Sequence, residues 1–198
     1  PRPRPRARAL LFAQLSLPLS AVLVACCPSL TRRGLPATQG EYAKKPAAFF
    51  RRMSTRPSLD GLWPNCFERS SGVITFGADG DSFYEYLLKG YLQGGKQEPL
   101  LWKMYNDAVD GMEKWLVHKG PEGLTYLSNV RWTGGGSASQ DHAMEHLSCF
   151  AAGWLALGSR HQTDPGRKRR HMKLAEDIAE TCWQVRFPLP AASSQWCP

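Results

Sequence analysis

The apolar and polar positions beyond residue 40 recur mostly with the period of an α-helix. In residues 99–118, apolar side chains recur every three or four positions and would share one helix face: 100, 101, 104, 105, 108, 112, 115 and 116. Similar patterns predict a short amphipathic helix over residues 41–55 and two later helices over residues 142–157 and 172–183. The chain is therefore expected to be chiefly helical.

Extended structure is expected in only two places. Residues 73–76 favour a short strand, and residues 124–132 favour extended backbone before the glycine loop at 134–136. Ser82 and Glu85 match a capping box, which predicts a helix over residues 82–93 that Gly94 ends. The pattern predicts an all-α fold of consecutive helical hairpins with a minor β insertion.

Two of the six cysteines lie on the last predicted helical hairpin. A polar loop containing Asp164 and Gly166 joins its two helices, so they should run antiparallel. Cys149 and Cys182 would then lie roughly level. A disulfide and a pair of buried free thiols both remain open from the residues alone.

The two ends of the chain differ from its middle. Residues 1–8 hold four arginines, and residues 9–27 form an uncharged, mostly apolar run. This pattern is typical of a signal peptide or a marginal membrane anchor, although a low-complexity Pro-Arg segment remains the alternative. We therefore expect a leader or unrelated segment over residues 1–40, a folded domain over 41–186 and an irregular tail over 187–198.

The net charge of +8 does not indicate a nucleic-acid partner. Six of the positive charges lie in residues 1–33, which contain no acidic residue, so the other 165 residues carry only +2. No nucleic-acid recognition motif accompanies the basic clusters. We expect no nucleic-acid binding.

A glycine-rich loop before the predicted helix at 82–93 holds two acidic residues, Asp79 and Asp81. Asp81 lies at the junction of loop and helix, where unpaired N–H groups and the helix dipole favour a carboxylate. Such a carboxylate either caps the helix or belongs to an active site. The capping box already accounts for Glu85.

His142, Glu145 and His146 match the H-x-x-E-H zinc signature on a predicted helix. Two histidines four residues apart would share a helix face and bind Zn²⁺, with Glu145 as the base and Glu176 or Glu180 as the third ligand. The alternative is a helical surface with one functional histidine. On an apolar helix face, His146 would ordinarily be a satisfied core residue.

Four blocks of the sequence, in order from about residue 59 to 183, resemble the family-47 glycoside hydrolases, the class I α1,2-mannosidases. The blocks are Gly61-Leu-Trp-Pro-Asn65, Thr75-Phe-Gly-Ala-Asp-Gly-Asp-Ser-Phe-Tyr-Glu-Tyr-Leu-Leu-Lys89, Glu145-His-Leu-Ser-Cys-Phe-Ala-Ala-Gly153 and Ala175-Glu-Asp-Ile-Ala-Glu-Thr-Cys182. The resemblance implies an α/α toroid of seven helix pairs, of which this chain supplies a consecutive portion. It also implies inverting hydrolysis of terminal α1,2-linked mannose from high-mannose N-glycans, with Ca²⁺ at the barrel floor.

The resemblance also implies roles for individual residues. Asp81 matches an active-site carboxylate that positions the acid or the water, Glu85 a second acid in the cleft, and His146 a residue that contacts sugar or organises water. Asp79 occupies a position that contacts the glycan branch, but it matches neither the arginine of endoplasmic-reticulum members nor the small apolar residue of Golgi members. Cys149–Cys182 matches the family disulfide.

The resemblance places the remaining machinery outside these blocks. The usual general acid lies upstream, and the candidate general base and the calcium-site threonine lie in later helices. We expect a luminal protein of the endoplasmic reticulum or Golgi, monomeric and of type II membrane topology if the leader is an anchor. The 198-residue chain alone is expected neither to cleave mannose nor to bind Ca²⁺ tightly. A non-catalytic glycan-binding or vestigial product remains the alternative.

Overall fold

The computed structural model describes residues 37–66 and 69–186. The predicted leader run at 9–27 and the predicted tail at 187–198 lie outside these residues, as do Cys26, Cys27 and Cys197. The proposed boundaries of the leader, domain and tail therefore stay predictions. None of the helices in the described ranges is long and apolar enough to cross a membrane.

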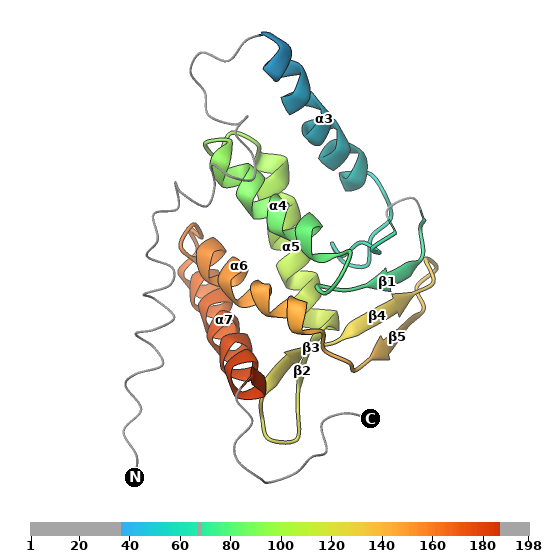
Figure 1. The fold of residues 1–198 in the computed structure, drawn as a ribbon, viewed down its shortest axis with the longest axis vertical. Coiled ribbons are helices and arrows are strands. Elements are labelled where there is room, and N and C mark those ends of the chain that lie inside the picture. Colours follow the sequence, from blue (N-terminus) through green and yellow to red (C-terminus); the bar gives the residue numbers. More distant parts are fainter. Residues whose placement is uncertain (1–36, 67–68, 187–198) are drawn as a thin grey trace. The chain divides into compact units, whose positions relative to one another are not determined.

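The described residues are mostly helical, as the sequence predicts, with short strands between the helices (Figure 1). In chain order the elements are α3 (Ala37–Ser54), β1 (Gly72–Ile74), α4 (Asp81–Gln93), α5 (Pro99–Trp115), β2 (Val117–Lys119), β3 (Thr125–Leu127), β4 (Asn129–Trp132), β5 (Ala138–Asp141), the 3₁₀ helix η1 (His146–Cys149), α6 (Phe150–Ser159) and α7 (Pro165–Arg186). The chain divides into two units, Pro1–Phe49 and Phe50–Pro198, and the boundary falls within α3. The second unit holds all the elements that follow α3.

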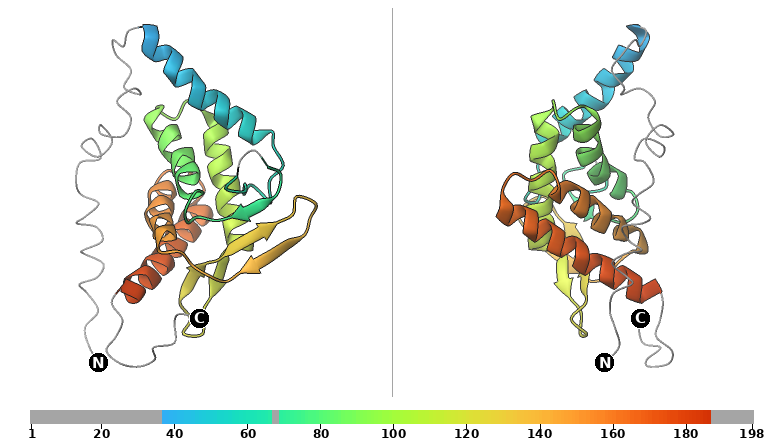
Figure 2. Two further views of the ribbon diagram at one scale, coloured as in Figure 1. Left: turned by 45° about the vertical axis from the view of Figure 1, so that its right-hand side comes forward. Right: turned by 90° about the vertical axis from the view of Figure 1, so that its left-hand side faces the viewer.

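Two pairs of packed helices are the main helical elements of the second unit. Helix α4 packs along α5, and α6 packs along α7, in both views of Figure 2. The first pair is joined by a turn at Gly94 and Gly95, whose positive φ of 67° suits glycine. Pro99 then begins α5 at a position where its missing N–H costs nothing. This pair confirms the predicted hairpin.

Two small antiparallel sheets are built from β1, which precedes α4, and from the four strands between α5 and η1. In one, β4 is central and pairs with β1 and with β5; in the other, β2 pairs with β3. The glycine-rich turn between β4 and β5 contains Gly134 and Gly136, both with positive φ. The predicted minor β insertion is confirmed in β1, β3 and β4, whereas β2 and β5 lie outside the two segments that were expected to be extended.

An aromatic cluster forms the centre of the core and fixes the start of the loop that leads into α4. Phe76, just after β1, is almost completely buried and stacks on Tyr84 of α4 with a centroid distance of 4.1 Å. Trp154 of α6 meets Phe76 edge-on at 5.5 Å and also contacts Tyr105 of α5 at 4.7 Å. These side chains join three helices to one loop, because aromatic rings bury large apolar areas.

The helix predicted over residues 142–157 is wrong in its first half. Strand β5 ends at Asp141, and the carboxylate of Asp141 accepts the N–H of Ala143 at 3.2 Å. The side chain of Asn129 donates to the carbonyl of Ala143 at 3.3 Å. These side-chain bonds and strand pairing compete with helix formation, so α6 begins only at Phe150.

Helix α7 begins seven residues before the predicted start, at Pro165 rather than Met172. The carboxylate of Asp164 accepts the N–H of Arg167 at 2.6 Å, and proline suits the first turn. The predicted polar loop is therefore shorter than expected. The antiparallel arrangement of α6 and α7 is retained.

Candidate functional site

The loop between β1 and α4 is closed by its own backbone. The carbonyl of Gly77 accepts the N–H groups of Gly80 and Asp81, at 3.2 and 3.0 Å. Gly80 is tightly enclosed, because a Cβ there would overlap the carbonyl oxygen of Thr75. The sequence Gly-Ala-Asp-Gly thus folds into a compact turn that delivers Asp81 to the first position of α4.

Asp81 is half-buried and is the first residue of α4, so the N-cap position belongs to Gly80, which has no side chain to cap the helix. The described partner of its carboxylate is the hydroxyl of Ser82, at a long 3.5 Å. The capping explanation for Asp81 is therefore wrong, as is the predicted capping box of Ser82 and Glu85. The backbone turn starts the helix one residue before Ser82, so no side-chain cap is needed there.

The other acidic candidates lie on either side of Asp81. Asp79 is exposed at the tip of the loop, with a positive φ of 67° that aspartate tolerates better than most residues. Glu85 lies one turn further along α4 and forms an ion pair with Lys89 at 2.6 Å. Glu85 is thus paired along its own helix, whereas Asp79 belongs to the same loop as Asp81.

His146 does not lie on a buried helix face. It begins the 3₁₀ helix η1 and is exposed, as is the neighbouring Leu147, which keeps 47% of its surface accessible. The alternative of a satisfied core histidine is therefore wrong. The reason is the late start of α6, which leaves residues 142–149 outside the α-helix.

Glu145 connects the Asp81 loop to the segment that begins with His146. Its Oε2 atom accepts the N–H of Ala78 at 2.9 Å, and its Oε1 atom accepts the hydroxyl of Thr75 at 3.4 Å. The H-x-x-E-H pattern predicts only a zinc-site base at Glu145. No periodicity or local motif reveals a contact across 67 residues, so only the fold could show this role.

The predicted zinc site is not formed. His142 lies just after β5, where its Nδ1 atom is 2.9 Å from the hydroxyl of Tyr126 and its ring stands 4.9 Å from that of His118. Glu145 is engaged by the Asp81 loop instead. Within residues 37–66 and 69–186, no group of three or more His, Cys, Asp or Glu side chains could hold a metal ion.

A disulfide joins Cys149 and Cys182, with a Cα–Cα distance of 6.0 Å. This finding decides between the disulfide and the free thiols that the residues alone left open. It links the end of η1 to the last turns of α7 and so confirms that α6 and α7 run antiparallel. It also anchors the segment that carries His146.

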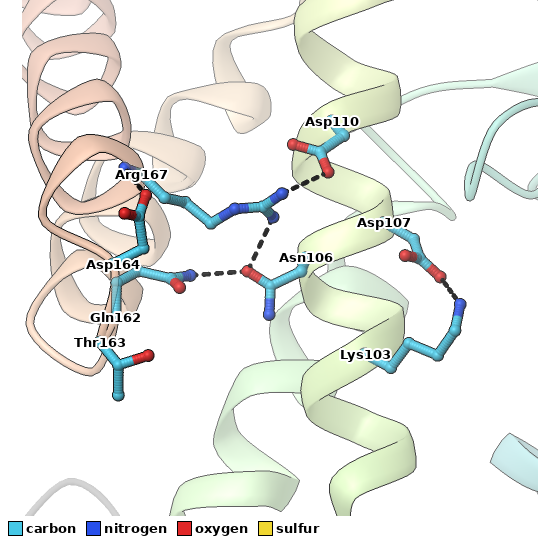
Figure 3. Close-up of a pocket in the computed structure, with 8 residues that line it drawn as sticks. All are labelled: Lys103, Asn106, Asp107, Asp110, Gln162, Thr163, Asp164 and Arg167. Atoms are coloured by element: carbon cyan, nitrogen blue, oxygen red, sulfur yellow. Dashed lines mark hydrogen bonds and ion pairs between the residues drawn. The ribbon is translucent and has the colours of Figure 1, made fainter.

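The described residues also form a pocket of about 370 Å³ between α5 and the turn before α7 (Figure 3). Its polar side chains bind one another: Asn106 accepts from Gln162 at 2.6 Å and from Arg167 at 3.1 Å, and Arg167 pairs with Asp110 at 2.9 Å. None of the candidate carboxylates or His146 lines this pocket. Its contacts tie α5 to α7 and do not mark the candidate site.

Comparison with known proteins decides the family. The sequence model of glycosyl hydrolase family 47 matches residues 36–191. This chain belongs to glycosyl hydrolase family 47. The match includes the Asp81 loop, His146 and both disulfide cysteines, so the resemblance seen in the sequence is confirmed.

Several relatives of this family-47 chain are mannosidases. It is 42% identical over 133 residues to the human "Endoplasmic reticulum mannosyl-oligosaccharide 1,2-alpha-mannosidase", with 64% of this chain and 18% of the relative covered. It is 41% identical over 127 residues to the Sus scrofa "Mannosyl-oligosaccharide 1,2-alpha-mannosidase IA" (62% and 18%) and 36% identical over 148 residues to a Candida albicans mannosidase (67% and 26%). The family-47 chain thus spans about a fifth to a quarter of the length of these relatives.

Proposed function

We propose that this chain carries one part of the active site of an α1,2-mannosidase that removes terminal mannose from high-mannose N-glycans. The observation that carries the proposal is the position of Asp81 on the loop that Glu145 ties to the segment of His146. In this family-47 chain, the loop provides a carboxylate without a capping role beside a segment with an exposed imidazole.

The proposed chemistry assigns each side chain a separate task. Inverting hydrolysis needs one carboxyl group to protonate the leaving oxygen and another to activate water. Asp81 positions the acid or the water. The start of α4 favours the negative charge that its carboxylate carries in this role. His146 contacts the sugar or orders the water, Glu85 lines the cleft, and Asp79 contacts a glycan branch. The general acid and base come from other parts of the full family fold.

We further propose that these helices form a consecutive part of an α/α toroid of seven helix pairs. The full protein would act as a monomer in the lumen of the endoplasmic reticulum or Golgi. The disulfide supports an oxidising compartment, and the name of the human relative supports the endoplasmic reticulum. The residues at 9–27 would serve as a signal peptide or membrane anchor. Calcium would bind the full fold.

A chimera tests the proposal directly. Residues 59–183 would replace the matching segment of the human endoplasmic-reticulum relative, and mannose release from a high-mannose glycan would be measured. We expect the chimera to be active and Asp81→Asn to lower kcat by about 100-fold or more. Glu122→Gln, at an exposed residue in the turn between β2 and β3, is the matched control. An active Asp81→Asn chimera would contradict the proposed role of Asp81.

The 198-residue chain by itself tests the alternative. We expect it to release no mannose, since the general acid and base are supplied elsewhere. Release of mannose by the purified chain would refute that expectation. An inactive chimera that still binds mannose oligosaccharides, with binding unaffected by Asp81→Asn, would instead favour a non-catalytic glycan-binding protein.

A further inference from the structure

Glu145 holds the Asp81 loop through both oxygens of its carboxylate. One oxygen accepts the backbone N–H of Ala78 at 2.9 Å, and the other faces the hydroxyl of Thr75 at 3.4 Å. Hydrogen bonds to an ionised carboxylate are stronger than those between neutral groups. The contact therefore clamps the loop to the segment between β5 and α6.

Thr75 extends the clamp to the backbone N–H of Gly77. The N–H of Gly77 donates to the Thr75 hydroxyl oxygen at 2.7 Å, and that hydroxyl can then donate its proton to Glu145. Thr75 is almost completely buried, so its hydroxyl has little access to water. Hydrogen bonds in such a chain polarise and strengthen one another. Two backbone N–H groups of the loop thus depend on one carboxylate.

Gly77 provides the space that the carboxylate occupies. A Cβ atom at Gly77 would overlap the carboxyl group of Glu145. Gly77 does not have a positive φ, so its backbone conformation does not require glycine. A glycine is needed there because a side chain would block the close approach of the Glu145 carboxylate. Loop and carboxylate fit each other in shape as well as in hydrogen bonding.

We infer that Glu145 is a positioning residue that fixes the Asp81 loop relative to His146. Glu145 immediately precedes His146, and Ala78 lies three residues before Asp81, so one side chain couples the two candidate segments. The disulfide at Cys149 anchors the same segment to α7. The catalytic consequence rests on the proposed function, whereas the clamp itself does not.

Amide hydrogen exchange in the 198-residue chain tests the clamp without any glycan. We expect Glu145→Ala to increase exchange at Ala78 and Gly77 on the order of tenfold, as loss of a charge-assisted hydrogen bond implies. Glu145→Gln should restore much of the protection at Ala78, because its amide oxygen still accepts that N–H. Glu122→Ala is the matched control and should change neither amide. Unchanged exchange in a folded Glu145→Ala variant would overturn the inference.

The chimera described above tests the catalytic consequence. Glu145→Ala should lower kcat by about 10- to 100-fold with a smaller change in KM, because misplacing a catalytic group affects the transition state most. Glu145→Gln should recover a large part of kcat. Faster exchange together with unchanged kcat would overturn the positioning role. An inactive parent chimera would refute the proposed function alone, and amide exchange would still decide whether Glu145 clamps the loop.

Discussion

The hydroxyl of Tyr84 bonds both backbone groups of Trp63. It accepts the Trp63 N–H at 3.1 Å and donates to the Trp63 carbonyl at 3.2 Å, across 21 residues of sequence. Tyr84 is almost completely buried, and this burial raises the pKa of its hydroxyl well above the ordinary value for tyrosine. One side chain of α4 thereby fixes the turn that precedes β1.

Removal of this hydroxyl is expected to be costly. Tyr84→Phe leaves a buried N–H and a buried carbonyl without their partner, so we expect a loss of about 2–4 kcal/mol in the free energy of unfolding. Urea denaturation would measure the loss. Tyr86→Phe, two residues away on the same helix and only half-buried, is the matched control and should cost under about 1 kcal/mol. Equal losses in the two variants would contradict the proposed importance of the Trp63 contact.

The disulfide should stabilise the second unit strongly. Cys149 and Cys182 are 33 residues apart in sequence. A cross-link of that span lowers the conformational entropy of the unfolded chain and so raises the free energy of unfolding by about 3–4 kcal/mol. We expect the double variant Cys149→Ala, Cys182→Ala to lose a free energy of unfolding of that size. Cys66→Ala removes an exposed free thiol and serves as the control. A double variant as stable as the control would show that the bond contributes little.

Two glycines of α6 should respond in opposite directions to the same substitution. A Cβ at Gly158 would overlap the buried Tyr105 ring, so Gly158→Ala should cost about 1–3 kcal/mol or more. Nothing lies within 4 Å of a Cβ at Gly153, which is exposed, so Gly153→Ala should gain about 0.5–1 kcal/mol. Thermal unfolding of both variants measures the difference. A stabilising Gly158→Ala would contradict the packing described for Tyr105.

His171 should make the protein less stable in acid. Its side chain is fully buried, and burial, followed by the nearby Arg167 and Arg170, lowers its pKa to about 4, although Asp110 opposes this shift. The unfolded chain takes up the proton near pH 6.5, so the native state loses stability as pH falls from about 6.5 to about 4. The loss should be roughly 2–3 kcal/mol.

Denaturation at pH 7 and at pH 4 checks this effect. His171→Gln should remove most of the stability loss that protonation of His171 causes. An acid sensitivity that His171→Gln does not reduce would assign the effect to other groups.

Much of the fold could be predicted because its signals are local. The helical period of apolar residues in 99–118 predicted α5, and α4 ends before Gly94, as the sequence predicted. The errors occurred where distant residues compete with local preference. Asn129 and Asp141 hold residues 142–145 outside any helix, and the backbone turn at Gly77 starts α4 without the capping box.

The family, the mostly helical chain and the candidate residues follow from the sequence alone, because family motifs and helical periodicity depend on residues close together in the chain. Three outcomes became apparent only in the folded protein: Asp81 is not a cap, His146 is exposed, and Glu145 binds the Asp81 loop rather than a zinc ion. Each of these outcomes depends on a contact or on burial between residues far apart in sequence. Such contacts form when packing brings distant segments together, and no local pattern records them.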